Sequence, residues 1–231
     1  MKILLSPSKT KKLQGKPTAP VFDKVMTDAI VGHMKTLTAE VIVKALKVKP
    51  DMAAELVAFY QNHDDAPVGA AAFSYSGLAF KNLAWSELSE KAQAFGNDHV
   101  CILSGLYGIV TPESPITDYR LDLVDRIFAK NIINKSVIDG LLQDVKTLYD
   151  CWTEKVTAYF QAEDWLLNLA SKEYAKLVSH PRMVTVEFLE LKEGVWKQLS
   201  TSSKQMRGRL AHYMIAVSYT HLRAHETRRH L

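Results

Sequence analysis

Three short apolar runs in this chain each end at a serine that opens a polar turn. The runs occupy residues 2–5, 100–103 and 166–170, and they are followed by Ser6, Ser104 and Ser171. Continuous apolar runs bounded by turn residues are typical of strands buried on both faces of a parallel sheet. The loops that leave the carboxyl ends of such strands gather at one edge and line a crevice. We therefore expect three distant segments to deliver serine, lysine, tyrosine and glutamate side chains to one place.

The remaining pattern alternates between helical and extended periodicities. Apolar spacing predicts helices over 22–34, 85–95 (with Ser86 near its cap and a turn at 96–98), 136–160 and 206–215, and alternation around Gly194 predicts a β-hairpin within 184–199. Strands mixed with helices in this order favour an α/β fold. We predict a mixed sheet with parallel core strands, flanking helices and some antiparallel pairing at an edge.

Residues 37–62 predict two short helices joined by a tight basic turn. Thr38 is a plausible N-cap, and Pro50 suits the first turn of the second helix. This pattern suggests an inserted helix-hairpin-helix, a motif that holds the amides of its turn against a DNA phosphate whatever the base sequence. The candidate DNA-binding residues are Lys44, Lys47 and Lys49.

Composition narrows the class of protein. Hydrophobic residues make up 47% of the 231-residue chain, enough for the core of one large domain, and no apolar run approaches the roughly 18 residues of a membrane helix. The two cysteines form no disulfide or metal pattern, and the histidines show no paired ligand spacing. We expect a cytoplasmic protein that binds no membrane, metal or cofactor.

The last fifteen residues, 217–231, lack apolar periodicity and resemble the translation of a common sequencing adapter. We therefore expect one α/β domain over 1–216, truncated at its C-terminus, followed by a non-native tail. Arg223, Arg228 and Arg229 against Glu226 give the tail +2 of the formal net charge of +4, which leaves +2 for residues 1–216. Phosphate-binding residues must then be clustered, because the overall charge is modest for a nucleic-acid-binding protein.

Two of the strand ends carry candidate ligand-binding side chains. Ser6, Lys9 and Thr10 could bind an anion through hydroxyls, ammonium and backbone amides, although the glycines of a P-loop are absent and a solvated loop explains them equally well. Ser104 and Tyr107 lie in a glycine-containing turn, where the alternative is simple packing of the tyrosine on the sheet.

Further along the chain, each candidate also has a structural alternative. Arg120 could grip a phosphate or carboxylate, or pair internally with Asp122 or Glu173. Ser171 and Glu173 suit the start of a helix, where the negative glutamate interacts favourably with the helix dipole. Alternatively, Glu173 could act as a general base. Lys204 and Arg207 belong to a short basic run that either contacts phosphates or forms a solvated helix face.

Six blocks in order resemble the YaaA peroxide-stress family: LSPSKT at 5–10, FSYSGL at 73–78, LSGLYG at 103–108, YRL at 119–121, LASKEY at 169–174 and RG at 207–208. The resemblance implies a mixed α/β fold with an inserted helix-hairpin-helix, binding of double-stranded or branched DNA, and survival of hydrogen peroxide by limiting free iron. It also implies that one cleft is lined by Lys9, Tyr75, Tyr107, Arg120, Ser171, Glu173, Lys204 and Arg207.

Two functions from different classes remain open. The first is a peroxide-stress protein that binds DNA without base specificity and helps limit iron-dependent oxidative damage. The alternative is an enzyme acting on a phosphorylated or nucleotide-like small molecule, in which Lys9 and Arg120 hold the anion and Glu173 or Tyr107 transfers a proton. The enzyme hypothesis requires these four side chains to converge on one cavity. No residue is assigned a catalytic role, and a non-catalytic binding protein is favoured.

Overall fold

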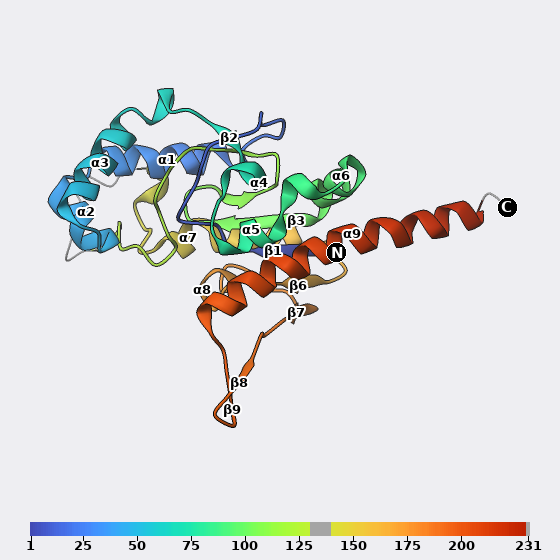
Figure 1. Ribbon diagram of the computed structural model, residues 1–231. Helices are drawn as coiled ribbons and strands as arrows, with labels where there is room; N and C mark the ends of the chain where they lie inside the picture. Colours follow the sequence, from blue (N-terminus) through green and yellow to red (C-terminus); the bar gives the residue numbers. More distant parts are fainter. Residues whose placement is uncertain (130–139, 230–231) are drawn as a thin grey trace.

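A five-stranded sheet forms the centre of the protein (Figure 1). The computed structural model describes residues 1–129 and 140–229, with side chains placed as far as residue 217. The strand order is β4-β3-β1-β6-β7, in which β1, β3, β6 and β7 run parallel and β4 pairs antiparallel at one edge. This arrangement confirms the predicted mixed sheet with a parallel core. The strands are β1 (Lys2–Leu5), β3 (Val100–Ser104), β4 (Gly108–Val110), β6 (Leu166–Asn168) and β7 (Met183–Thr185).

The predicted core strands are the three innermost strands of this sheet. In β1, Leu4 pairs with Cys101 of β3 on one side and Asn168 of β6 on the other. All five residues of β3 are buried, as expected for a strand covered on both faces. Helices supply the cover, and Figure 1 shows the first half of α9 beside α5 across the sheet. The covering helices include α1 (Lys24–Lys35), α5 (Leu78–Leu83), α7 (Leu148–Phe160) and α9 (Ser200–Arg229).

The predicted pair of short helices is present as α2 (Ala39–Leu46) and α3 (Pro50–Gln61). The Thr38 hydroxyl caps α2 by accepting the Val41 N–H, as predicted. Residues 47–49 connect the two helices, and Lys47 adopts a left-handed conformation with φ of 53°. The structure therefore shows a helical hairpin, and its role as a DNA-binding helix-hairpin-helix remains a proposal.

Two predicted helices start later than expected. The segment predicted as one helix over 85–95 is a 3-10 turn, η2 (Trp85–Glu87), followed by α6 (Glu90–His99), because Ser89 rather than Ser86 accepts the capping N–H. The predicted turn at 96–98 is the last turn of α6. The helix expected over 136–160 begins only at Leu148, where Thr147 and Asp150 form a capping box. Residues 136–139 lie outside the described part of the chain.

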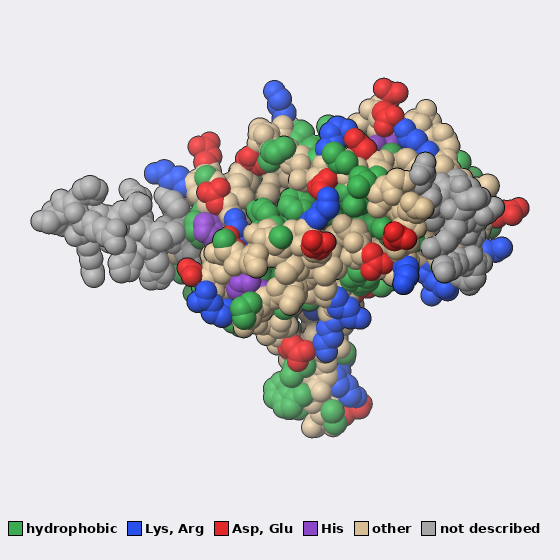
Figure 2. All heavy atoms as spheres, turned by 180° about the vertical axis from the view of Figure 1, so that it is seen from behind, with side chains coloured by type: hydrophobic (Ala, Val, Ile, Leu, Met, Phe, Trp, Pro, Cys, Tyr) green, Lys and Arg blue, Asp and Glu red, His purple; other side chains and the backbone are tan. Residues whose placement is uncertain are grey.

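The predicted hairpin around Gly194 is present and projects from the body (Figure 1). It consists of β8 (Glu190–Lys192) and β9 (Val195–Lys197), joined through two residues with positive φ, Glu193 and Gly194. Figure 2 shows hydrophobic and basic side chains on this hairpin at the bottom of the view. Trp196 is 64% exposed there.

Short elements complete the architecture and connect the large ones. No helix among the described residues is long and apolar enough to cross a membrane. Helix α9 continues through residues 217–229 as a helix, and the non-native origin of that tail stays a prediction. The short elements are β2 (Gly69–Ala70), β5 (Pro115–Ile116), α4 (Ala71–Ser74), α8 (Lys172–Ala175), η1 (His63–Asp65) and η4 (Gly140–Leu142).

Candidate functional site

The ends of β1 and β6 meet at one edge of the sheet. The Ser171 N–H donates to Ser6 Oγ at 2.8 Å, and the two hydroxyl oxygens lie 3.3 Å apart. A cleft of about 460 Å³ opens beside this contact. The predicted residues that line it come from three regions of the chain: Ser6, Lys9, Thr10, Ser171, Glu173, Lys204 and Arg207.

Helix α9 reaches the cleft because it crosses α5 at backbone contact. A Cβ on Gly208 would lie 2.0 Å from the carbonyl oxygen of Ala79, so only glycine allows this approach. The Arg209 guanidinium reinforces the crossing by donating from Nε to Asn82 Oδ1 at 3.0 Å. The crossing places the basic run of α9 over the strand ends.

Lys9 is held at the cleft by a partner that was not predicted. Its Nζ lies 2.7 Å from Asp122 Oδ2, and Asp122 also accepts a hydrogen bond from Tyr174 Oη at 2.9 Å. The sequence interpretation had offered Asp122 as a partner of Arg120, whereas the structure pairs it with Lys9. Burial, together with the nearby charge of Asp122, raises the pKa of the Glu173 carboxyl.

Arg207 lines the cleft without a partner for one of its donors. Its Nε–H is buried and makes no hydrogen bond to any described residue, and burial lowers the pKa of the guanidinium. An unpaired buried donor costs about 1–3 kcal/mol, more when charged. Lys204, one turn earlier on α9, is exposed. The cleft thus presents one buried cationic donor, Nε of Arg207, that no described residue satisfies.

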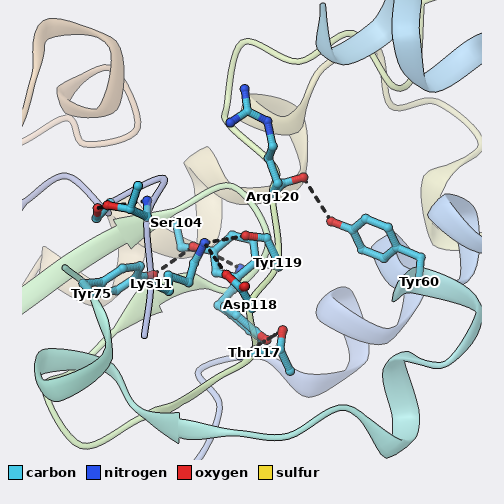
Figure 3. A network of polar contacts seen from close by, with 11 residues as sticks. Lys11, Tyr60, Tyr75, Ser104, Thr117, Asp118, Tyr119 and Arg120 are labelled. Carbon is cyan, nitrogen blue, oxygen red and sulfur yellow. Dashed lines mark hydrogen bonds and ion pairs between the residues drawn. The ribbon is translucent and has the colours of Figure 1, made fainter. Parts of the chain in front are cut away.

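Tyr75 and Ser104 lie in a separate buried network (Figure 3). The Tyr119 hydroxyl is 2.8 Å from Ser104 Oγ and 2.8 Å from the Tyr75 hydroxyl. Burial raises the pKa of both tyrosines, so they remain neutral donors and acceptors. Tyr75 and Ser104 were predicted to line the cleft, and the structure places both of them outside its lining.

Lys11 joins this network from the loop that follows β1. Its ammonium donates to the Tyr119 carbonyl oxygen and lies 4.3 Å from the centre of the Tyr119 ring (Figure 3). The side chain is only 2% exposed, and burial lowers its pKa to about 8. Sequence reasoning missed Lys11, although its place two residues after Lys9 in a strand-exit loop was a usable signal.

Tyr107 packs as the structural alternative predicted. Its hydroxyl is 2.9 Å from Thr117 Oγ1, and its ring meets Tyr119 edge-on at 5.2 Å. Gly108 has φ of 70°, and a Cβ there would lie 2.5 Å from the Trp152 ring. Gly108 accordingly makes room for Trp152 of α7, and a Cβ on Gly105 would lie 2.9 Å from the carbonyl oxygen of Leu121, so both glycines of this turn are explained by packing.

Arg120 lies beside the cleft rather than in its lining. It borders a small hollow together with Lys9, Lys11 and Asp122, and Figure 3 shows its side chain pointing away from the tyrosines. Its guanidinium forms no ion pair with any residue in the described ranges. Of the four side chains that the enzyme hypothesis requires to converge, only Lys9 and Glu173 line the cleft.

The candidate DNA-binding lysines occupy a different surface. Lys44, Lys47 and Lys49 are exposed around the turn of the helical hairpin and do not line the cleft. None of the three forms an ion pair within residues 1–129 and 140–217. Over the same residues, no group of three or more His, Cys, Asp and Glu side chains is placed to hold a metal ion.

Comparison with known proteins tests the resemblance carried by the six sequence blocks. A family model described as "Peroxide stress protein YaaA" matches residues 1–227. The chain belongs to the YaaA peroxide stress protein family. Four of the six blocks that carried the resemblance contribute residues to the lining of the cleft, namely those at 5–10, 73–78, 169–174 and 207–208.

Several relatives match this YaaA-family protein over nearly its whole length. A "UPF0246 protein" of Francisella tularensis subsp. mediasiatica is 30% identical over 235 residues, which cover 93% of this chain and 87% of the relative. A "UPF0246 protein" of Finegoldia magna is 30% identical over 224 residues, covering 93% and 84%. One of Francisella philomiragia is 28% identical over 235 residues.

Proposed function

We propose that this peroxide stress protein binds double-stranded or branched DNA through its phosphates, without reading base sequence. The observation that carries the proposal is the set of exposed lysines, Lys44, Lys47 and Lys49, around the turn of the helical hairpin. Lysine contacts to phosphate supply affinity and carry no base information.

The start of α3 supports phosphate binding at the same turn. Lys49 occupies the N-cap position but provides no side-chain cap, and Pro50 follows it. Pro50 has no N–H and the Ala53 N–H donates to the Lys49 carbonyl oxygen, so Asp51 and Met52 supply the first-turn N–H groups at the positive end of this twelve-residue helix. A phosphate at this position would accept from these amides and from the flanking lysines. Asp51 in the first turn opposes binding, which makes the lysines necessary.

The hairpin is held rigidly against the body of the protein. Ile42 and Leu56 are buried, and the Arg126 N–H donates to the Ala45 carbonyl oxygen at 3.0 Å. The Tyr60 hydroxyl donates to the Arg120 carbonyl oxygen at 3.3 Å. A turn fixed in this way loses little conformational entropy when it binds, which favours affinity.

The peroxide-stress role follows if the protein acts at DNA. Iron bound near DNA converts hydrogen peroxide into radicals that attack the sugars. A protein that occupies the backbone without base preference would displace cations from the phosphates, because binding releases the counterions condensed there. We infer that such occupancy limits iron-dependent damage to the bound DNA.

Fluorescence titration of labelled duplex and four-way junction DNA with the full chain tests the proposal. The variant Lys44→Ala/Lys47→Ala/Lys49→Ala should bind at least tenfold more weakly than the wild type. Lys91→Ala removes an exposed lysine of α6, at the other end of the molecule, and should bind within twofold of the wild type (Figure 1). Equal loss in both variants, or no binding by the wild type at low salt, would overturn the proposal.

The alternative function, an enzyme for a phosphorylated or nucleotide-like molecule, retains less support. Tyr107 is buried in the core and Arg120 borders a neighbouring hollow, so Glu173 is the remaining candidate for proton transfer at the cleft. The variant Lys44→Ala/Lys47→Ala/Lys49→Ala is called the hairpin variant below. Comparing its DNA affinity with that of Lys9→Ala separates the contribution of the cleft to DNA binding from that of the hairpin.

A further inference from the structure

Arg207 contributes to the lining of two hollows. The first is the cleft of about 460 Å³ described above. The second, of about 270 Å³, lies along α8 and β7. Arg207 lines both of them, so the two hollows adjoin at this residue. The polar residues of the second hollow include Asn168, Lys172, Lys176, Thr185 and Glu187.

Two of the three acidic residues that line these hollows are paired with lysines. Asp122 is paired with Lys9 at 2.7 Å, and Glu187 lies 3.4 Å from Lys172 Nζ. Glu173, the remaining acid of the first cleft, has its pKa raised by burial and by Asp122. No described carboxylate lies within ion-pair distance of the guanidinium, whose Nε–H also lacks a hydrogen-bond partner.

This environment fits an anion with several oxygens. A guanidinium is planar and presents parallel N–H donors that match two oxygens of one phosphate. Lys204 lies one turn earlier on the same helix and lines the same cleft, and the Ser6 hydroxyl adds a polar group at the strand ends. Gly208, by fixing α9 on α5, holds the neighbouring Arg207 in place before any ligand arrives.

The rest of the first cleft fits the body of a nucleotide. Its walls include the apolar side chains of Leu5, Leu78, Phe80 and Leu169. Its volume falls within the roughly 300–1,000 Å³ of small-molecule sites, where apolar walls and a few polar groups are usual. An apolar wall suits a flat base, and the cationic end suits the phosphate attached to it.

We propose that Arg207 binds the phosphate of a nucleotide whose base lies in the larger cleft. Two sources share this chemistry: a free nucleoside monophosphate and the 5′-phosphorylated end of a DNA strand. The site is separate from the helical hairpin, so it does not depend on the duplex binding proposed above.

Isothermal titration calorimetry with the full chain tests the site. The probes are adenosine 5′-monophosphate, adenosine, and a short single-stranded oligonucleotide with or without a 5′-phosphate. The monophosphate should bind at least tenfold more tightly than adenosine. Arg207→Gln should weaken that binding at least tenfold, and Arg207→Lys should weaken it less. Arg182→Gln, which removes an arginine whose side chain is 66% exposed and which lies outside both linings, should stay within twofold of the wild type.

The results distinguish a free nucleotide from a DNA strand end as the ligand. They also distinguish this site from the duplex binding proposed for the helical hairpin. Preference for the phosphorylated oligonucleotide over the monophosphate assigns the site to strand ends, and the reverse assigns it to free nucleotides. Equal binding of monophosphate and adenosine, no binding of any probe, or unchanged binding by a folded Arg207→Gln overturns the inference. Thermal unfolding followed by circular dichroism establishes that each variant is folded. Arg207→Gln should keep its duplex affinity, and the hairpin variant should keep its nucleotide affinity.

Discussion

Ser6 and Ser171 are 165 positions apart in the chain, yet the Ser171 N–H donates to Ser6 Oγ at 2.8 Å. The contact arises because β1 and β6 are parallel neighbours whose carboxyl ends leave the sheet at the same edge. It ties the loop that carries Lys9 to the start of α8, which carries Glu173. The cleft is therefore built on adjacent strands of the core.

Replacing Gly208 with alanine should destabilise the protein. The added Cβ would lie 2.0 Å from the Ala79 carbonyl oxygen and would force α9 away from α5. We expect the free energy of unfolding to fall by about 1–3 kcal/mol, the usual range for overpacking. Urea denaturation followed by circular dichroism measures it.

Gly32→Ala is the matched control for that substitution. Gly32 lies in α1, where a Cβ would meet nothing within 4 Å, so alanine should be neutral or stabilise the helix by up to about 1 kcal/mol. A neutral Gly208→Ala, or an equal loss at both glycines, would contradict the close crossing of α5 and α9.

Tyr119→Phe should destabilise the buried network without creating a large cavity. The substitution removes hydroxyl contacts of 2.8 Å with both Ser104 and Tyr75 and leaves their groups buried. The expected loss is about 1–3 kcal/mol in the free energy of unfolding. Tyr213→Phe, at a ring that is 60% exposed, should change stability by less than about 0.5 kcal/mol. Similar effects for both substitutions would argue against the network.

Asp125 should make stability depend on pH. Burial, with the nearby charge of Asp122, raises the pKa of this carboxyl from 3.8 to about 7. The folded state therefore binds the proton more tightly than the unfolded state, and the resulting stability is present below about pH 4 and lost as pH rises through 7. The effect is at most about 4 kcal/mol.

Asp125→Asn removes this titration and serves as the comparison. Relative to the wild type, the variant should become progressively more stable between pH 4 and pH 8, as measured by chemical denaturation at each pH. A stability difference that does not change with pH would show that Asp125 titrates normally in the folded protein.

The parallel core was predictable, because runs such as residues 2–5 and 100–103 are apolar without alternation and end in turn residues. Helix starts were less predictable where two serines lie close together. Ser86 and Ser89 both suit an N-cap, and in the structure Ser89 caps α6 while Trp85, next to Ser86, packs against Gly96. Local sequence does not report such a distant contact.

The sequence predicts where the candidate site lies, at the ends of the parallel strands, but only some of the side chains that line it. The loops after β1 and β6 meet, whereas Ser104 at the end of β3 turns toward Tyr119 in the core. Spacing along one segment cannot distinguish these directions, because they depend on where residues 117–123, which follow β5, pack against the strand ends. The pairing of Lys9 with Asp122 depends on the same segment.

Protection of DNA should follow from DNA binding. Supercoiled plasmid exposed to ferrous iron and hydrogen peroxide should be nicked more slowly in the presence of saturating wild-type protein. The variant Lys47→Ala/Lys49→Ala should protect less at the same concentration, because it occupies less of the backbone. Gel quantification of nicked plasmid measures the effect. Equal protection by the wild type and the variant would show that the hairpin lysines do not contribute to the protection of DNA.

The most direct test of the account is the salt dependence of duplex binding. The logarithm of the association constant should fall linearly with the logarithm of salt concentration, with a slope of about −0.9 for each phosphate contacted. Replacing both Lys47 and Lys49 with alanine should reduce the magnitude of that slope by about 2, while Lys91→Ala leaves it unchanged. A slope near zero in the wild type, or the same slope in the double variant, would contradict phosphate binding at the helical hairpin.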